Sequence, residues 1–221
     1  MNRSVLVVAL CLGLGAQEAP KPAAPPATPI AAATPAPAPP AAPAALQDDG
    51  LLDPAWFGAG IAFAKSDDVD FFWVKPGLNL AGRTIQMKAW EDPSMLRKGR
   101  DGKDNAKATE LTDAFPAMLR GALAGAFNGK AKVSRTEGDL TLTGRFVDAN
   151  AGNKVAKWLI GLGAGSETAT WDLKVLDTKT GEVLLAVHHR AISLTAMSNI
   201  QDKMGKWADK FSTFVATQAI K

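Results

Sequence analysis

Hydrophobic and polar residues alternate along several short segments, which is the pattern of strands that bury one face. In the clearest segment Trp171, Leu173 and Val175 share one face, and polar residues occupy the positions between them. Alternation or a short apolar run predicts strands at 71–74, 84–90, 132–136, 140–147, 171–175 and 182–190. Tight turns at 137–139 and 177–181 are expected to join neighbouring strands.

Two longer segments, 111–127 and 199–218, repeat apolar residues every three to four positions and therefore predict helices. Pro116 fits the first helix only in its first turn, for example with Asp113 as the N-cap, because proline has no N–H to donate. An earlier start would mean a kink at Pro116. The elements together predict an α/β (α+β) fold, in which a single mostly antiparallel or mixed sheet of about four to six strands is covered by the two main helices.

The segment 91–107 is polar and is interpreted as a mobile loop. Its basic residues Arg97, Lys98 and Arg100 are candidate interaction residues, because loops commonly carry recognition groups. The acidic residues of this loop lack the spacing and the central glycine of a calcium-binding EF-hand, so no metal site is expected. The three aspartates of 67–70 are interpreted as a solvated turn.

The N-terminal part differs in composition from the rest. Residues 1–16 combine a basic start with a short apolar stretch and are interpreted as a signal peptide that is too short to span a bilayer. Residues 17–49 consist mainly of Ala and Pro, which predicts a disordered tether with polyproline II character. A single domain is expected at 50–221, in a periplasmic or extracellular protein. A lipid anchor at Cys11 is a minority alternative, because Leu10 does not suit lipoprotein processing.

Charge and cysteine content exclude several classes of function. The net charge is +3 and the charges are interspersed, which argues against a nucleic-acid partner. The chain has one cysteine, Cys11, so after signal cleavage no disulfide, thiol nucleophile or cysteine metal site is expected. No cofactor and no transmembrane segment are expected in the mature protein.

A glycine-rich loop contains Gly161, Gly163, Gly165 and Ser166. A phosphate-binding loop should follow a strand and open a helix, whereas this loop precedes a predicted strand. We therefore interpret it as a structural or interaction loop rather than a nucleotide site.

His188 and His189 are the two histidines of the chain. Neighbouring residues of a strand point to opposite faces, so the two histidines are not expected to share a metal ion. One half-buried and one exposed histidine are expected. An enzymatic alternative uses either histidine as a general base, with Ser166 and Asp172 as the nearest companions. Asp172 is expected on the strand face opposite Trp171.

The order of elements, the Gly161–Ser166 loop and the hairpin Asp177-x-x-Thr180-Gly181-Glu182 resemble a bacterial envelope family known as a domain of unknown function, often lipoprotein-like. The architecture is distantly similar to domains of the curli-secretion lipoprotein and of the lipoprotein activators of penicillin-binding proteins. The resemblance implies a fold and a compartment and supplies no catalytic residues.

The sequence therefore favours a non-enzymatic cell-envelope accessory or binding module. Strand edges and the 97–107 loop are its expected recognition surface. An envelope protein or a cell-wall component is the expected partner, and homo-oligomer formation stays open. The alternative is a small hydrolase or nucleotide-binding enzyme that uses the Gly161–Ser166 loop and His188 or His189.

Overall fold

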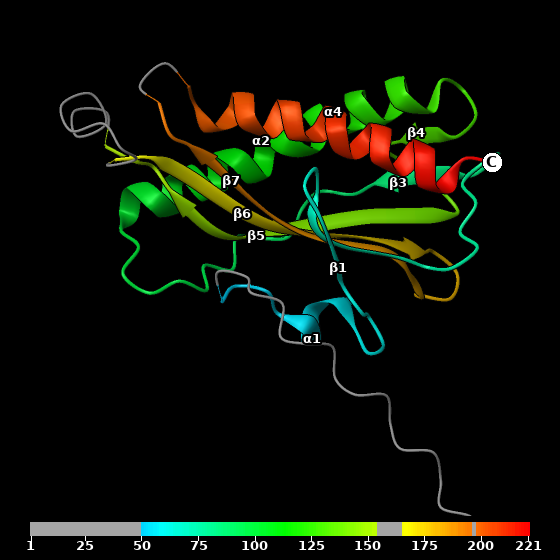
Figure 1. The fold of residues 1–221 in the computed structure, drawn as a ribbon, viewed down its shortest axis with the longest axis horizontal. Helices are drawn as coiled ribbons and strands as arrows, with labels where there is room; N and C mark the ends of the chain where they lie inside the picture. Colours follow the sequence, from blue (N-terminus) through cyan, green and yellow to red (C-terminus); the bar gives the residue numbers. More distant parts are fainter. Residues whose placement is uncertain (1–49, 154–164, 196–197) are drawn as a thin grey trace, which may run out of the picture. The chain divides into compact units, whose positions relative to one another are not determined.

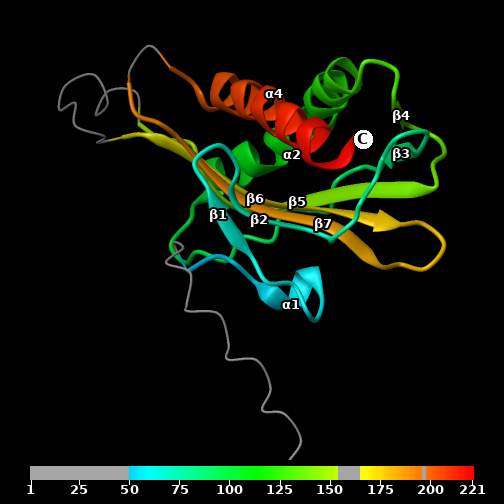
Figure 2. The same ribbon diagram turned by 45° about the vertical axis from the view of Figure 1, so that its right-hand side comes forward.

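A computed structural model describes residues 50–153, 165–195 and 198–221. One mixed sheet is covered on one face by two long helices and on the other by the segment that contains a short helix (Figures 1 and 2). The helices are α1 (Pro54–Phe57), α2 (Gly102–Phe127) and α4 (Ile200–Ala219). The strands are β1 (Ala64–Ser66), β2 (Asp70–Val74), β3 (Thr84–Met87), β4 (Lys132–Ser134), β5 (Leu140–Asn150), β6 (Glu167–Asp177) and β7 (Val183–Ser193).

The sheet confirms the predicted fold class and has slightly more strands than expected. Its order is β1-β2-β7-β6-β5-β3-β4, with seven strands among the described residues. The additional strand is β1, which is three residues long and mostly exposed, and therefore shows no hydrophobic alternation. Strands β5, β6 and β7 form an antiparallel meander, whereas β3 pairs in parallel with both β4 and β5.

The predicted tight turn at 137–139 does not join two paired strands. Strand β3 lies between β4 and β5, and all three are parallel. The connection is fixed to β3 by Asp139, whose side chain accepts a hydrogen bond from the Thr84 amide at 2.7 Å and pairs with Arg83. A Cβ at Gly138 would lie 2.6 Å from the Thr84 carbonyl oxygen, so glycine is needed for this close crossing.

Helix α2 begins at Gly102, twelve residues before the position expected from an N-cap at Asp113. The N-cap is Asp101, which accepts hydrogen bonds from the amides of Lys103 at 2.8 Å and Asp104 at 3.0 Å. Asp104 accepts from the Asp101 amide in return, which completes a capping box. The expectations of a loop up to residue 107 and of Asp113 as the N-cap are therefore wrong. The first turns of α2 are largely exposed and polar, and so they carry no apolar periodicity.

Helix α4 confirms the second predicted helix. It begins after the N-cap Asn199, whose side chain accepts from the Asp202 amide at 2.8 Å. Both long helices bury their apolar faces on the sheet, and the centre of this layer is aromatic: the ring centroids of Phe115 and Trp171 are 5.2 Å apart, and those of Trp171 and Trp207 are 5.0 Å apart. Trp171 and Phe115 are fully buried.

Candidate functional site

A group of ionisable side chains, all buried except Asp53, lies on the sheet face that carries α1. We call it the α1-face network, and its members are Asp53, Arg145, Asp172 and His188. Arg145 on β5 donates to Asp172 on β6 and to Asp53, at 3.0 Å in each case. His188 Nδ1 on β7 lies 2.7 Å from the other oxygen of Asp172. Asp172 therefore joins cationic or polar groups from both neighbouring strands.

Helix α1 covers this network with Trp56. The Arg145 guanidinium lies 4.8 Å and the Lys174 ammonium 3.9 Å from the Trp56 ring centroid. Burial lowers the pKa of Lys174. Asp53 is the N-cap of α1 and accepts a hydrogen bond from the Ala55 amide at 3.1 Å, and the hydrogen bond from Arg145 lowers the pKa of its carboxyl group. The charges are thus satisfied by one another and by an aromatic cover.

His189 lies on the opposite face of β7, as the alternation of strand side chains predicts. Its Nδ1 is 2.7 Å from Asp70, and its ring stacks on Trp207 with a centroid distance of 4.9 Å. Burial lowers the pKa of His189, and Asp70 opposes this shift. One half-buried and one exposed histidine were expected. The exposed fractions are 2% for His188 and 12% for His189, so the expectation of an exposed histidine is wrong, and each histidine lies beside its own carboxylate partner. Asp70 is also half-buried rather than part of a solvated turn.

The enzymatic alternative required Ser166 to lie near a histidine. Ser166 directly precedes β6, whereas Asp172 and its partner His188 lie six residues further along the paired strands. At about 3.3 Å per residue this is roughly 20 Å. The structure therefore does not bring Ser166, His188 and His189 together.

The described end of the glycine-rich loop leads into β6, as expected. Gly161 and Gly163 lie outside the described residues. Gly165 has a φ of +71°, and its carbonyl oxygen accepts from the Asn153 amide at 2.9 Å. Gly165 and Ser166 line a pocket of about 450 Å³ that Asp101 and Asp104 also line. These two carboxylates outnumber Lys103, the one cation of the lining, and so disfavour a phosphate ligand.

The basic residues of the 91–101 segment have different environments. Arg100 donates two hydrogen bonds of 2.6 Å to Asp148, which is completely buried, and Asp148 raises the pKa of Arg100. Arg97 Nε lies 3.6 Å from the same carboxylate, whereas Lys98 is exposed. The segment also donates backbone hydrogen bonds to β5. One of them joins the Ser94 amide to the Phe146 carbonyl oxygen at 2.8 Å. It is therefore docked on the sheet, and the expectation of a mobile loop is wrong for this part.

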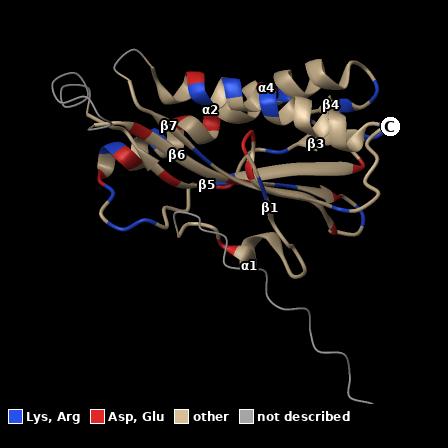
Figure 3. Ribbon diagram, viewed as in Figure 1, with Lys and Arg blue, Asp and Glu red and all other residues tan. Residues whose placement is uncertain are grey.

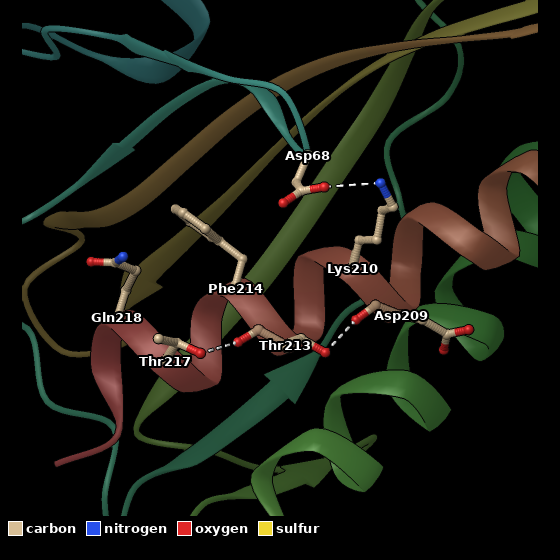
Figure 4. Close-up of a pocket in the computed structure, with 7 residues that line it drawn as sticks. All are labelled: Asp68, Asp209, Lys210, Thr213, Phe214, Thr217 and Gln218. Atoms are coloured by element: carbon tan, nitrogen blue, oxygen red, sulfur yellow. Dashed lines mark hydrogen bonds and ion pairs between the residues drawn. The ribbon is translucent and has the colours of Figure 1, made fainter.

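An open groove of about 440 Å³ lies on the outer side of α4 (Figure 4). Asp68 and Lys210 pair across it at 2.9 Å, and both are 59% exposed. The hydroxyls of Thr213 and Thr217 donate to carbonyl groups of the preceding helical turn, so they are not directed at a ligand. The groove is lined by Asp68, Asp209, Lys210, Thr213, Phe214, Thr217 and Gln218.

A second open pocket, of about 320 Å³, lies where α2 passes the ends of β3 and β4. Its lining combines the basic side chains of Lys88, Arg120 and Arg135 with apolar groups. Lys130 and Lys132, in the loop before β4 and in β4, lie beside Gly82 and Thr84 at the other end of β3, where Figure 3 shows basic segments near β4. We call Lys88, Arg120 and Arg135 the basic corner. None of their side chains has a hydrogen bond or ion pair with another described residue. Sequence reasoning missed this group because its members are spread over three separate segments.

The described residues contain no group of three or more His, Cys, Asp or Glu side chains suited to a metal ion. None of their helices is both long enough and apolar enough to cross a bilayer.

Several solved structures are similar to this chain at low sequence identity. The PelC dodecamer from Paraburkholderia phytofirmans has a TM-score of 0.45 and 9% identity, over 68% of this chain and 96% of that chain. Lipoprotein GNA1162 from Neisseria meningitidis has a TM-score of 0.36 and 11% identity, over 61% of this chain and 97% of that chain. Protein XCC0632 from Xanthomonas campestris has a TM-score of 0.34 and 13% identity, over 65% and 87% of the two chains.

Among curated proteins, no sequence matches this chain. A family model described as a domain of unknown function (DUF4410) matches residues 86–196, half of the chain. The protein therefore belongs to this family, which confirms the expectation of a family of unknown function.

Proposed function

We propose that this protein is a non-enzymatic binding or accessory module of the bacterial cell envelope, which presents residues 50–221 to a partner. One observation carries the proposal. The groups that could perform acid–base chemistry are paired inside the fold on opposite faces of the sheet, whereas the three cationic side chains of the basic corner line an open pocket and have no ion-pair partner in the part of the chain that the structure describes. Unpaired surface charge beside a pocket suits recognition better than catalysis.

The envelope placement rests on the composition of the N-terminal part. We propose cleavage of a signal peptide at 1–16 and a tether at 17–49, which releases the protein into the periplasm or the medium. Intact-mass measurement of the protein from its native host tests this proposal. A mass that corresponds to Gln17 onward supports it, an acylated Cys11 shows a lipoprotein instead, and a mass of the whole chain contradicts both.

Site-specific photo-crosslinking in intact cells tests the binding role. A photoreactive residue replaces Ala117, which is exposed at the basic corner, and in a matched strain it replaces Thr217 in the groove of Figure 4. At one of the two positions we expect a discrete crosslinked product that contains an envelope component. An excess of the unlabelled domain should suppress the formation of this product. Absence of any position-specific product at native abundance contradicts the proposal.

The enzymatic alternative has its own readout. Hydrolysis of chromogenic ester and phosphate substrates is measured for the wild type, Ser166→Ala and His188→Gln. Turnover by the wild type that both substitutions abolish, while folding is retained, overturns the non-enzymatic assignment.

A further inference from the structure

The three cations of the basic corner reach one pocket from three separate segments. Lys88 follows β3, Arg120 belongs to α2, and Arg135 follows β4. Asp113 is the one acidic residue of the lining, so three cations and one carboxylate leave the lining with a net charge of +2. None of these four side chains forms an ion pair with a residue that the structure describes. An anionic ligand would balance the excess positive charge.

The outer edge of the chain after β3 is open at this pocket. Strand β4 is three residues long, and its last pair with β3 is Ser134 with Gln86. The amides of Lys88 and Glu91 donate to carbonyl groups of β5 at 3.1 and 2.9 Å. Ala89, which lies between them, is exposed and lines the pocket, and its amide donates to no group of the described chain. Neighbouring residues of an extended chain direct their N–H groups to opposite sides, so the Ala89 amide faces away from β5 and can donate to a ligand.

The pocket also has an apolar part. Met87 and Trp90 line it and are only 5% and 6% exposed. The Trp90 ring packs edge-on against Phe115, with a centroid distance of 5.0 Å, which fixes its position. Pro116 and Ala117 of α2 line the same pocket and carry no charge. An apolar side chain of a ligand can therefore pack beside the cations.

We propose that the basic corner binds the C-terminal end of a partner polypeptide that ends in an apolar residue. Arg120 and Arg135 hold the terminal carboxylate, because a guanidinium group donates two parallel hydrogen bonds to a carboxylate. The Ala89 amide donates to a carbonyl group of the bound peptide, as an open strand edge does in peptide recognition. This inference rests on the proposed binding function and names the partner class. The need for a free terminal carboxylate distinguishes this ligand from an internal acidic segment and from a lipid headgroup.

A peptide with the sequence Gly-Ser-Gly-Ser-Val-Val, labelled with tetramethylrhodamine at its N-terminus, tests the proposal by fluorescence anisotropy with the full mature chain. We expect binding that weakens as salt increases, because the ion pairs are partly exposed. The same peptide with an amidated C-terminus should bind at least about tenfold more weakly, because it lacks the charge that the arginines hold. A peptide that ends in Gly-Gly should bind at least about threefold more weakly, because it has no side chain to bury in the apolar part.

Two double variants show whether the carboxylate lies at the basic corner. Arg120→Met with Arg135→Met should weaken binding of the Val-Val peptide at least about tenfold and bring its affinity within about twofold of that of the amidated peptide. Lys179→Met with Lys203→Met is the matched control, because it removes the same charge at exposed positions elsewhere. This control should stay within about twofold of the wild type.

Amide exchange measured by NMR tests the backbone contact. The Val-Val peptide should slow the exchange of the Ala89 amide proton, which charge attraction alone would not do. The proposal is overturned if the amidated or the Gly-Gly peptide binds equally well, if both double variants weaken binding equally, or if the Ala89 amide stays unprotected. It is also overturned if the folded wild type binds no peptide at low salt, whether or not vesicles containing phosphatidylglycerol bind. An envelope crosslink at another position would still support the binding module, so the two proposals fail separately.

Discussion

At the scale of single residues, buried charge is concentrated on a few carboxylates that each hold two partners. Asp172 accepts from Arg145 and contacts His188, and Asp148 accepts two hydrogen bonds from Arg100. Both carboxylates are completely buried. A buried ion is tolerated only when its partners replace the lost water, so these positions are sensitive to the loss of one partner.

Arg145 provides the clearest test of this sensitivity. We expect Arg145→Met to lower the free energy of unfolding by about 3–5 kcal/mol, because it leaves Asp172 buried without its guanidinium partner. Lys210→Met is the matched control, since the pair of Lys210 with Asp68 is exposed and should contribute only about 0–1 kcal/mol. Urea denaturation measures both values. Equal effects of the two substitutions would contradict the structural role of the α1-face network.

His189 should make stability depend on pH. Burial lowers its pKa below the ordinary value of 6.5, so the unfolded chain binds this proton more readily than the folded protein does. No cost arises above pH 6.5, where the residue is neutral in both states. The free energy of unfolding should therefore fall as the pH drops from 6.5 to the lowered pKa of His189 in the folded protein.

Urea denaturation of the wild type and of His189→Gln between about pH 5 and 8 isolates this contribution. Glutamine does not titrate and keeps a polar side chain beside Asp70. The variant should lose part of the decline below pH 6.5, whereas an unchanged pH profile would show that His189 is not the group responsible.

At the scale of elements, α2 is held by a capping box far from the apolar face that identifies the helix. We expect Asp101→Ala to cost about 0.5–2 kcal/mol of stability, because the amides of Lys103 and Asp104 lose their acceptor. Asp113→Ala is the matched control, since Asp113 is exposed within the helix and alanine favours helices. Thermal unfolding measures both. The reverse order of effects would place the start of the helix at Asp113.

The elements that the sequence predicts correctly are those with an apolar face. Strand β6 and helix α4 bury Trp171 and Trp207 at regular positions, so their periods are visible. The start of α2 is exposed and polar, and β1 is too short to show a period. The position of β3 between β4 and β5 could not be predicted, because local alternation does not specify which strands pair.

The candidate site was less predictable than the fold. Arg97, Lys98 and Arg100 were selected for their charge. Arg97 and Arg100 instead contact Asp148, which lies 48 residues after Arg100 in the chain. Asp148 lies directly after a register shift in β5, and a charged residue in a strand is ordinarily interpreted as solvent-facing. The basic corner depends on contacts between α2, β3 and β4 that no sequence motif marks.

At the scale of the whole domain, the sheet has two different faces, and both are covered. The face under α2 and α4 is apolar and aromatic, whereas the face under α1 carries the charged network. Residues 50–63 belong to this cover: Leu51 and Phe57 are almost completely buried. We therefore expect the segment that contains α1 to be part of the stable domain, although it lies outside the match to the family model.

Two fragments test this boundary. The core cluster of described residues extends from Val69 to Ala219, so a fragment of residues 50–221 should unfold cooperatively, with a free energy within about 1 kcal/mol of the full chain. A fragment of residues 64–221 keeps every strand but loses Phe57 and the cover over Arg145. Burial of a large apolar side chain is worth about 1.5–3 kcal/mol, so this second fragment should be less stable by at least about 2 kcal/mol. Urea denaturation of the two fragments and the full chain decides the point. Equal stability of the two fragments would show that α1 is an accessory segment, and loss of folding in the 50–221 fragment would show that the domain begins before residue 50.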